Sequence, residues 1–371
     1  MEPVSYELEV IDVVEETPDA HSITFRVPTE AAADFTYRPG QFLTVAVPSD
    51  QTGVAARCYS LSSSPGDEGA EATVTITVKR TAEGYASNWI CDRVGAGDTL
   101  RVLPPSGIFT PASLDADLLL FAGGSGVTPI MSITRTALSR GSGQITVFYA
   151  NRDERSVIFA RELSELAAAH PGRLHVIHWL ESVQGLPSQE QLRAFAAPYL
   201  ERDAFVCGPA PFMKMTTAAL KELEIPRARR HQEKFVSLGG NPFGEVPAAV
   251  EAAEPPAPAA ATAGVEESSS GDVSVTDDAD PVRLEVELDG EKHVFDDWDR
   301  STTLLEHLEA RGVKAPYSCR EGECSACAVR LIEGEVSMAH NDVLDDEDLA
   351  DGIRLACQAT ATTDVVRASY S

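Results

Sequence analysis

The chain has 371 residues, which is more than one hydrophobic core normally supports and predicts two or three domains. Its formal net charge of −28 argues against nucleic acid and anionic membrane surfaces as partners, because both require basic patches. No apolar run reaches the length of about eighteen residues that a membrane-spanning helix needs, and the first ten residues do not resemble a signal peptide. Four of the seven cysteines lie at or beyond position 319, which is typical of a metal or redox site rather than a disulfide framework. We therefore expect a cytoplasmic protein with no disulfide-linked partner.

Residues 1–111 predict a small antiparallel β-barrel. Short stretches of alternating apolar and polar residues are separated by turns that contain Pro and Gly, such as the one at 38–40. The predicted strands span 6–13, 22–27, 42–47 and 73–78.

Residues 112–244 predict an α/β domain with a parallel sheet. Buried apolar strands now alternate with helical stretches, which is the usual signature of that architecture. The predicted strands span 118–122, 145–149, 174–180 and 204–207, and the predicted helices lie near 130–139 and 159–169.

An acidic linker is predicted at 245–281. No Lys or Arg occurs between Glu245 and Asp280, and the segment is rich in Ala, Pro, Glu and Ser, so it cannot bury enough apolar surface to fold. We expect the domain beyond the linker to be tethered but mobile.

Residues 282–371 predict a third domain. Strands at 283–288 and 292–295 flank an Asp-Gly turn and form a hairpin, and a helix follows. Leucines at helical spacing define this helix at Leu304, Leu305 and Leu308.

Two motifs in the barrel domain are suited to bind a phosphate-bearing cofactor. Arg57, Tyr59 and Ser60 lie where we expect a strand to begin, and a guanidinium can contact a phosphate with two hydrogen bonds. Gly84 and Ser87 precede a predicted helix that Ser87 is expected to cap, and a helix N-terminus attracts anions. Taken alone, these residues favour ordinary strand and turn chemistry.

Two further motifs lie in the α/β domain. A glycine-rich turn contains Gly123, Gly124 and Gly126, followed by Thr128, which we expect to cap a helix with a proline at its first position. The sequence Cys207-Gly208-Pro209 follows another strand. A glycine turn after a strand is weak evidence by itself, and Cys207 also fits an ordinary buried cysteine. Arg152 lies just beyond a strand and is either a nucleotide contact or a surface residue.

The strongest signal in the sequence is a set of four cysteines. Cys319, Cys324 and Cys327 follow the spacing C-x4-C-x2-C, and Cys357 comes later, as in plant-type [2Fe–2S] sites. The alternative is structural zinc, which usually uses two short C-x2-C pairs or added histidines, and neither occurs here. The four thiolates therefore predict a [2Fe–2S] cluster.

These motifs resemble two known families. The segment around the four cysteines is similar to plant-type ferredoxins, which implies a β-grasp domain and a one-electron carrier. The order of motifs in residues 1–240 resembles the ferredoxin–NADP reductase superfamily, which implies a flavin on the barrel and a pyridine nucleotide on the α/β domain. The resemblance implies flavin contacts at Arg57, Tyr59, Ser60, Lys79, Gly84 and Ser87. It implies nucleotide contacts at Gly123, Gly124, Gly126, Thr128, Arg152, Cys207, Gly208 and Pro209.

The resemblance also implies residues near the reacting atoms. Ser60 is expected beside the flavin ring and Cys207 beside the nicotinamide. Glu233 and Phe235 lie where relatives end the nucleotide domain against the flavin. A simple core role is the alternative for Phe235.

The domain order is similar to that of reductases that serve two-component Rieske oxygenases, and most similar to those of 3-ketosteroid 9α-hydroxylases. This resemblance implies that electrons pass from NADH through FAD and the [2Fe–2S] cluster to a terminal oxygenase, for steroid or aromatic ring hydroxylation. An NADPH-dependent reductase of a phenylacetyl-CoA-type oxygenase is the alternative, and FMN is the alternative to FAD. A metal-binding redox sensor is a more distant interpretation.

Overall fold

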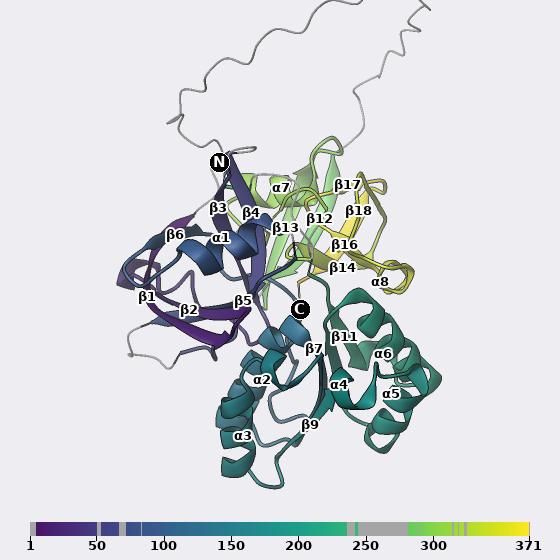
Figure 1. The fold of residues 1–371 in the computed structure, drawn as a ribbon. Helices are drawn as coiled ribbons and strands as arrows, with labels where there is room; N and C mark the ends of the chain where they lie inside the picture. The colour runs from purple at the N-terminus through teal and green to yellow at the C-terminus, as the bar shows by residue number, and fades with distance from the viewer. Residues whose placement is uncertain are drawn as a thin grey trace, which may run out of the picture.

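The computed structural model describes residues 5–49, 53–66, 72–82, 84–235, 242–243, 281–288, 290–313, 315–317, 319–322 and 325–370. Three sheets dominate the structure, and Figure 1 shows one domain around each, arranged about a central region in which the C-terminus lies. We call them the barrel domain, the α/β domain and the C-terminal domain. The predicted linker lies outside the described residues except for its last position.

The barrel domain contains six antiparallel strands in the order β4-β3-β6-β1-β2-β5. A bridge between Leu61 and Ile76 joins the chain just after β4 to β5 and closes the sheet. Apolar side chains such as Val10 and Phe25 alternate with polar ones and fill the interior, and α1 packs Ile90 against them. The elements are β1 (Tyr6–Thr17), β2 (Ala20–Arg26), β3 (Phe42–Ser49), β4 (Gly53–Ser60), β5 (Thr73–Lys79), α1 (Tyr85–Arg93) and β6 (Thr99–Val102).

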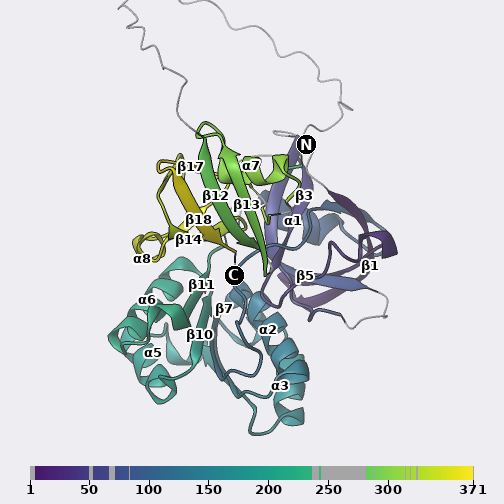
Figure 2. The ribbon, with the colours of Figure 1, turned by 180° about the vertical axis from the view of Figure 1, so that it is seen from behind.

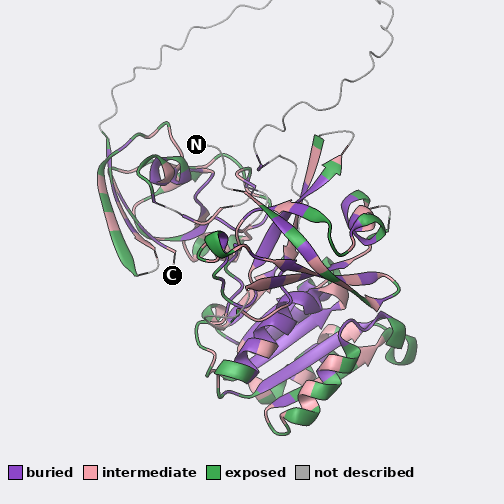
Figure 3. Cartoon of the chain, turned by 90° about the vertical axis from the view of Figure 1, so that its left-hand side faces the viewer, coloured by how far each residue is buried: buried purple, intermediate pink, exposed green. Residues whose placement is uncertain are grey.

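The α/β domain contains five parallel strands in the order β11-β10-β7-β8-β9. Alternate residues of β7 face opposite sides of the sheet, so Leu120 packs toward α2 and α3 whereas Phe121 packs toward α5 and α6. Figure 3 shows these buried strands between helices, several of which have exposed outer faces, whereas α2 is buried along most of its length. The elements are β7 (Leu118–Gly123), α2 (Val127–Arg140), β8 (Ile145–Asn151), α3 (Ala160–Ala169), β9 (Leu174–Leu180), α4 (Glu181–Gln184), α5 (Gln189–Ala196), β10 (Asp203–Cys207), α6 (Ala210–Glu222) and β11 (Arg230–Glu233).

The C-terminal domain contains a mixed sheet in the order β13-β12-β18-β14-β16. Its strand β12 pairs antiparallel with β13 and parallel with β18, and α7 packs three leucines against the sheet. The elements are β12 (Val282–Leu288), β13 (Glu291–Trp298), α7 (Leu304–Ala310), β14 (Ala328–Glu333), β15 (Val336–Met338), α8 (Asp346–Ala350), β16 (Ile353–Leu355), β17 (Ala359–Ala361) and β18 (Val365–Ser369). The predicted hairpin and leucine helix are both present.

The C-terminal domain contacts both other domains, as Figures 1 and 2 show from opposite sides. Toward the barrel domain, Ala326 packs with Phe42 and Ala56, and the Ser106 hydroxyl donates to the Tyr317 carbonyl at 3.2 Å. Toward the α/β domain, α8 forms ion pairs with basic residues near β11. The domain that the sequence predicts to be mobile is therefore docked in this structure. None of the described helices is long and apolar enough to cross a membrane.

Candidate flavin, nucleotide and cluster sites

The first predicted flavin motif lies on β4, but at the end of the strand rather than at its beginning. Arg57 and Tyr59 pair with residues of β3, because β3 and β4 form a regular hairpin over their whole length. Side chains alternate along β4, so Tyr59 packs against the barrel core whereas Ala56 and Cys58 pack toward the C-terminal domain. Burial raises the pKa of Tyr59 above its usual range and keeps its phenol neutral. Ser60 is buried at the strand end.

The second flavin motif lies at the start of α1. The prediction that Ser87 caps this helix is wrong, because Gly84 occupies the N-cap position and Ser87 lies inside the first turn. The Ser87 hydroxyl instead accepts a hydrogen bond of 3.0 Å from the Thr81 backbone N–H. A Cβ atom at Gly84 would lie 2.8 Å from the Thr81 Cβ, so this turn requires glycine. Lys79 ends β5 nearby, and its ammonium lies 3.6 Å from the Asp19 carboxylate.

The two nucleotide motifs meet at the carboxyl ends of β7 and β10. A Cβ atom at Gly126 would lie 2.2 Å from the Cys207 carbonyl oxygen, and one at Gly123 would lie 2.9 Å from Cδ of Pro209. This close approach explains why glycine is needed at both positions. Gly124 has a φ of 53° and open space around its Cα. The two loops form one continuous surface at the sheet edge, where open α/β sheets bind ligands.

The predicted capping role of Thr128 is also wrong. A short 3₁₀ turn at Gly124–Gly126 precedes α2, and Gly126 takes the N-cap position. Thr128 is therefore buried inside the helix, where its hydroxyl donates to the Ser125 carbonyl at 3.1 Å. The glycine turn still presents a helix N-terminus, which favours anions such as a pyrophosphate.

Buried titratable groups lie directly below this surface. Cys207 on β10 is in register with Glu233 on the neighbouring strand β11. Burial raises the pKa of the Cys207 thiol well above its usual range, and the nearby Glu233 carboxyl raises it further. Burial also raises the pKa of Glu233 to about 8 and lowers that of His231 to about 4. Cys207, His231 and Glu233 are therefore largely uncharged at pH 7.

A groove of about 650 Å³ opens beside these strands. Gly208, Pro209, Lys234 and Phe235 line it. Phe235 is 48% exposed, which excludes the alternative that it belongs to the core. Arg152 is not part of this groove, because its guanidinium lies 3.3 Å from the Asp19 carboxylate at the junction with the barrel domain.

Helix α2 holds the predicted flavin and nucleotide sites together. The Ser132 hydroxyl donates to the Ser63 carbonyl at 2.6 Å, and Arg135 donates to the Ser62 carbonyl. Arg135 is itself fixed by Glu162 of α3 at 2.6 Å. Since Ser62 and Ser63 directly follow the β4 motif and α2 directly follows the glycine turn, these contacts place the two sites side by side.

The cluster site contains three buried thiols among the described residues, at Cys319, Cys327 and Cys357. Hydrogen bonds with Cys319 and then Cys327 raise the pKa of the Cys357 thiol, which shows that the three sulfurs converge. Cys324, the fourth predicted ligand, lies outside the described residues. No group of three His, Cys, Asp or Glu side chains that would hold a single metal ion occurs in the described ranges.

The loop around these sulfurs fits an iron–sulfur cluster. The Glu321 backbone N–H donates to the Cys319 sulfur at 3.4 Å, and the Gln358 amide donates to the Cys357 sulfur at 3.7 Å. Gly322 has a φ of 78°, and a Cβ atom there would lie 2.6 Å from the His340 carbonyl oxygen. Donors aimed at sulfur stabilise cluster thiolates and tune their potential. The chain therefore supplies a tight loop with hydrogen-bond donors at two of the three described thiols.

Sequence reasoning missed the residues that dock the C-terminal domain. Arg227 donates to the Asp348 carboxylate, and Arg230 lies 3.4 Å from Glu347. The signal was present as a basic run at 227–230 and an acidic run at 345–348, but only the fold shows that these two runs meet.

Comparisons with known proteins agree with this geometry. Residues 120–218 match the family described as "Oxidoreductase NAD-binding domain", and residues 286–362 match the "2Fe-2S iron-sulfur cluster binding domain". Among solved structures, phthalate dioxygenase reductase is similar, with a TM-score of 0.54, 20% identity and coverage of 98% of both chains. The full-length cytochrome P450 CYP116B46 from Tepidiphilus thermophilus gives a TM-score of 0.59 at 24% identity and covers 98% of this chain and 42% of its own. These likenesses confirm the predicted fold class.

Relatives with known roles match almost the whole chain. The ferredoxin reductase component of 3-ketosteroid-9-alpha-monooxygenase from Rhodococcus rhodochrous is 51% identical over 98% of this chain and 96% of its own. One of the subunits of the 1,2-phenylacetyl-CoA epoxidase from Escherichia coli is 30% identical over 97% of this chain and 96% of its own. The matches confirm the predicted oxidoreductase with an NAD-binding domain and a [2Fe–2S] cluster domain, and they favour it over the redox sensor. The chain belongs to the family of ferredoxin reductase components of oxygenases, which are NAD(P)H-dependent oxidoreductases.

Proposed function

We propose that this protein is an NADH-dependent reductase in which electrons pass from NADH through FAD to the [2Fe–2S] cluster and on to a Rieske-type oxygenase that hydroxylates a steroid. One observation carries the proposal. Strand β4 carries Tyr59 of the flavin motif on one face, while Ala56 on its other face belongs to the same apolar cluster as Cys319 of the cluster loop. A single strand therefore separates the predicted flavin site from the cluster.

Bound flavin accepts a hydride and supplies electrons singly, which is the conversion that a one-electron cluster requires. Glu233 and Cys207 lie where the nicotinamide is predicted to bind. Glu233 has a pKa of about 8 and stays largely protonated beside the neutral Cys207 thiol. A nicotinamide ring gains positive charge on losing hydride, and such a charge lowers the pKa of a neighbouring acid, so a nicotinamide bound here would be electrostatically coupled to Glu233.

Two contacts support the choice of FAD and NADH. Helix α1 packs Ala86 and Ile90 into the same core that Tyr59 contacts, which supports the second motif as the place where the diphosphate of FAD binds. Arg152 lies 3.3 Å from the Asp19 carboxylate, so a 2′-phosphate would compete with this carboxylate for its guanidinium. This pairing supports NADH over NADPH.

The steroid oxygenase is proposed from the similarity of whole chains. The relative that serves a 3-ketosteroid monooxygenase shares 51% of its residues with this chain, against 30% for the relative from the phenylacetyl-CoA epoxidase. A cytoplasmic location is part of the proposal, because NADH and a reducing pool that keeps thiols free are found there.

The test is a reconstituted reaction. The holoprotein is mixed anaerobically with NADH or NADPH, and reduction of flavin and cluster is followed by visible absorbance. A Rieske-type oxygenase and a 3-ketosteroid are then added with oxygen, and hydroxylated product is measured against nucleotide consumed. We expect a higher kcat/KM with NADH and product formation coupled to its oxidation.

Two results would contradict the proposal. A higher kcat/KM with NADPH would reverse the nucleotide choice, and Arg152→Ala would then reduce the NADPH advantage. Product formation with a phenylacetyl-CoA oxygenase but not with the steroid oxygenase would support the alternative acceptor.

A further inference from the structure

Helix α8 presents a row of ordered carboxylates to the α/β domain. Asp345 caps the helix, and its carboxylate accepts hydrogen bonds of 3.0 Å from the backbone N–H groups of Glu347 and Asp348. The Asp348 carboxylate in turn accepts from the Asp345 N–H at 3.1 Å. This reciprocal capping fixes the first turn of α8, so its acidic side chains project in defined directions.

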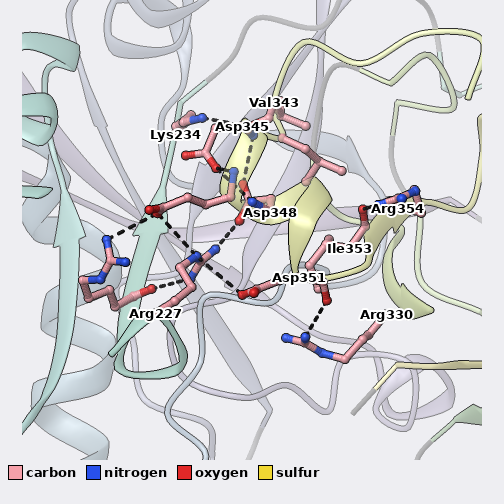
Figure 4. A network of polar contacts seen from close by, with 12 residues as sticks. Arg227, Lys234, Arg330, Val343, Asp345, Asp348, Asp351, Ile353 and Arg354 are labelled. Atoms are coloured by element: carbon pink, nitrogen blue, oxygen red, sulfur yellow. Dashed lines mark hydrogen bonds and ion pairs between the residues drawn. The ribbon is translucent and has the colours of Figure 1, made fainter. Parts of the chain in front are cut away.

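Basic groups of the α/β domain meet these carboxylates, as Figure 4 shows. Arg227 lies at the centre of the contact, where it donates to Asp348 and lies 3.8 Å from the Asp351 carboxylate. The same guanidinium lies 3.9 Å from Glu347, which is also paired with Lys221 at 2.9 Å.

Two more cations complete the contact. The Arg230 guanidinium lies 3.4 Å from Glu347, and its side chain is only 8% exposed. The Lys234 ammonium donates to the Val343 carbonyl at 2.8 Å, just before α8. The contact therefore joins four cations to three carboxylates and one carbonyl across the domain boundary.

The chemistry of this contact makes it strong but reversible. Arg227 and Asp348 are 28% and 19% exposed, so their attraction is screened less than that of a surface pair. The buried Nε of Arg227 has no hydrogen-bond partner, although two carboxylates lie within ion-pair distance. A contact that consists of charges, with one donor unsatisfied, releases more readily than an apolar one when salt or a competing charge is present.

Docking also covers part of the cluster loop. Cys319 is 3% exposed, and it packs in an apolar cluster with Phe42 and Ala56 of the barrel domain. This position suits electron entry from the flavin side, but the barrel domain occupies the Cys319 side of the loop. An external acceptor reaches that side only after the C-terminal domain moves away.

We propose that α8 and the basic residues Lys221, Arg227, Arg230 and Lys234 form an ionic latch that holds the C-terminal domain in its electron-accepting position, and that opening the latch uncovers the Cys319 side of the cluster for the electron acceptor. The second half rests on the proposed function. The first half concerns domain docking alone.

Charge reversal tests the latch in the holoprotein. Arg227→Glu places a carboxylate among three others, and Asp348→Arg makes the complementary change. The double variant restores an opposite pair. Arg161→Glu is the matched control, because Arg161 is a highly exposed arginine of the same domain and pairs with Glu165 of its own helix α3. The radius of gyration is measured by X-ray scattering over a series of NaCl concentrations, and cluster reduction by NADH is followed by stopped flow.

We expect the parent protein and the control to be compact at low salt and to expand as salt rises. Arg227→Glu should be expanded at low salt, and its cluster should be reduced on the order of tenfold more slowly, since a charge-assisted contact is lost. The double variant should recover both properties, which would show that the losses in the single variants come from the pair Arg227–Asp348.

Three outcomes would overturn the inference. If Arg227→Glu is as compact as the parent at every salt concentration, there is no latch. If the double variant stays expanded, the two residues do not act as a pair. If expansion leaves cluster reduction unchanged, the latch has no role in electron entry, and this result is independent of which oxygenase accepts the electrons.

Discussion

The C-terminal domain meets its two neighbours through contacts of opposite chemistry. Against the barrel domain it uses small and apolar residues, with Ala326 and Cys319 packed on Phe42, Ala56 and others. Against the α/β domain it uses charges. Three carboxylates, two on α8 and one just after it, lie within ion-pair distance of Arg227. The apolar contact brings the cluster loop close to β4, whereas the ionic contact lies away from it.

This difference separates two requirements of electron transfer. Small side chains allow close approach of the cluster to β4, and an apolar contact is not weakened by salt. Charges add docking strength that salt and competing charges can remove. The apolar contact thus sets the distance between the cluster loop and β4 in the docked state, and the ionic contact sets how firmly that state is held.

Loss of the cluster, which the apolar contact holds close to β4, should have the largest effect on electron transfer. Cys357→Ser removes one of the four predicted thiolate ligands, so we expect loss of the cluster and of NADH-driven cytochrome c reduction. Ferricyanide reduction should persist, because the predicted flavin and nucleotide sites are untouched. The measurements are electron paramagnetic resonance of the reduced protein and the two steady-state rates.

Cys91→Ser is the control, because Cys91 is a free, buried cysteine in the barrel domain. It should retain the cluster signal. Unchanged cytochrome c reduction by Cys357→Ser would show that electrons reach acceptors without the cluster.

A charge inserted in the apolar contact should have the next largest effect. Ala56 is 1% exposed and faces the cluster loop, so a carboxylate in Ala56→Glu must be buried without a partner or must push the loop away. We expect cluster reduction to slow on the order of tenfold to a hundredfold and salt to give little recovery. Ala56→Ser is the matched control and should slow the reaction far less. Equal rates for both substitutions, measured by stopped flow, would mean that this contact does not control electron entry.

The sequence predicted most of the fold because its signals are local. Alternation gave the barrel strands, and apolar runs separated by helical stretches gave the parallel sheet at 118–122 and 204–207. The two capping predictions failed for a local reason that spacing does not reveal. Gly84 and Gly126 take the cap positions because neighbouring atoms leave no room for a Cβ.

Parts of the candidate site were predictable and others were not. The converging cysteines and the meeting of the Cys207 and Gly126 loops follow from motif spacing and sheet topology. The pairing of Arg152 with Asp19 and of Arg227 with Asp348 joins residues more than a hundred positions apart. Such pairs depend on how domains dock, which no local pattern encodes.

The buried Glu233 carboxyl, whose pKa is shifted by burial, differs from the carboxylates of α8, which are paired with cations. Burial raises the pKa of Glu233 from 4.5 to about 8, so the folded protein binds a proton that the unfolded chain releases. Stability should therefore fall as pH rises from about 4.5 to 8 and then level off, by a few kcal/mol in total at about 1.4 kcal/mol per pH unit. Glu233→Gln, which carries no such proton, should lose this dependence and be more stable than the parent above pH 7. Melting temperatures across this range are the measurement, and parallel curves for the two proteins would show that Glu233 is ionised when folded.

The smallest effect on docking is expected for Glu347, at the exposed edge of the contact between α8 and the α/β domain. Glu347 is 37% exposed. A hydrogen bond from Lys221 is the main reason that its pKa lies below its usual range. The stabilisation contributed by the ionised carboxylate is therefore present above the usual pKa and is lost as pH falls. Glu347→Gln should weaken docking by less than about 1 kcal/mol at low salt, because exposed ion pairs are weak. The difference from the parent in radius of gyration should vanish as salt rises, since both proteins then lose this attraction. Glu165→Gln, which removes the partner of Arg161 on α3, is the control and should behave like the parent. If Glu347→Gln expanded the protein as strongly as Arg227→Glu, docking strength would depend on the exposed edge of α8 rather than on the partly buried pair between Arg227 and Asp348.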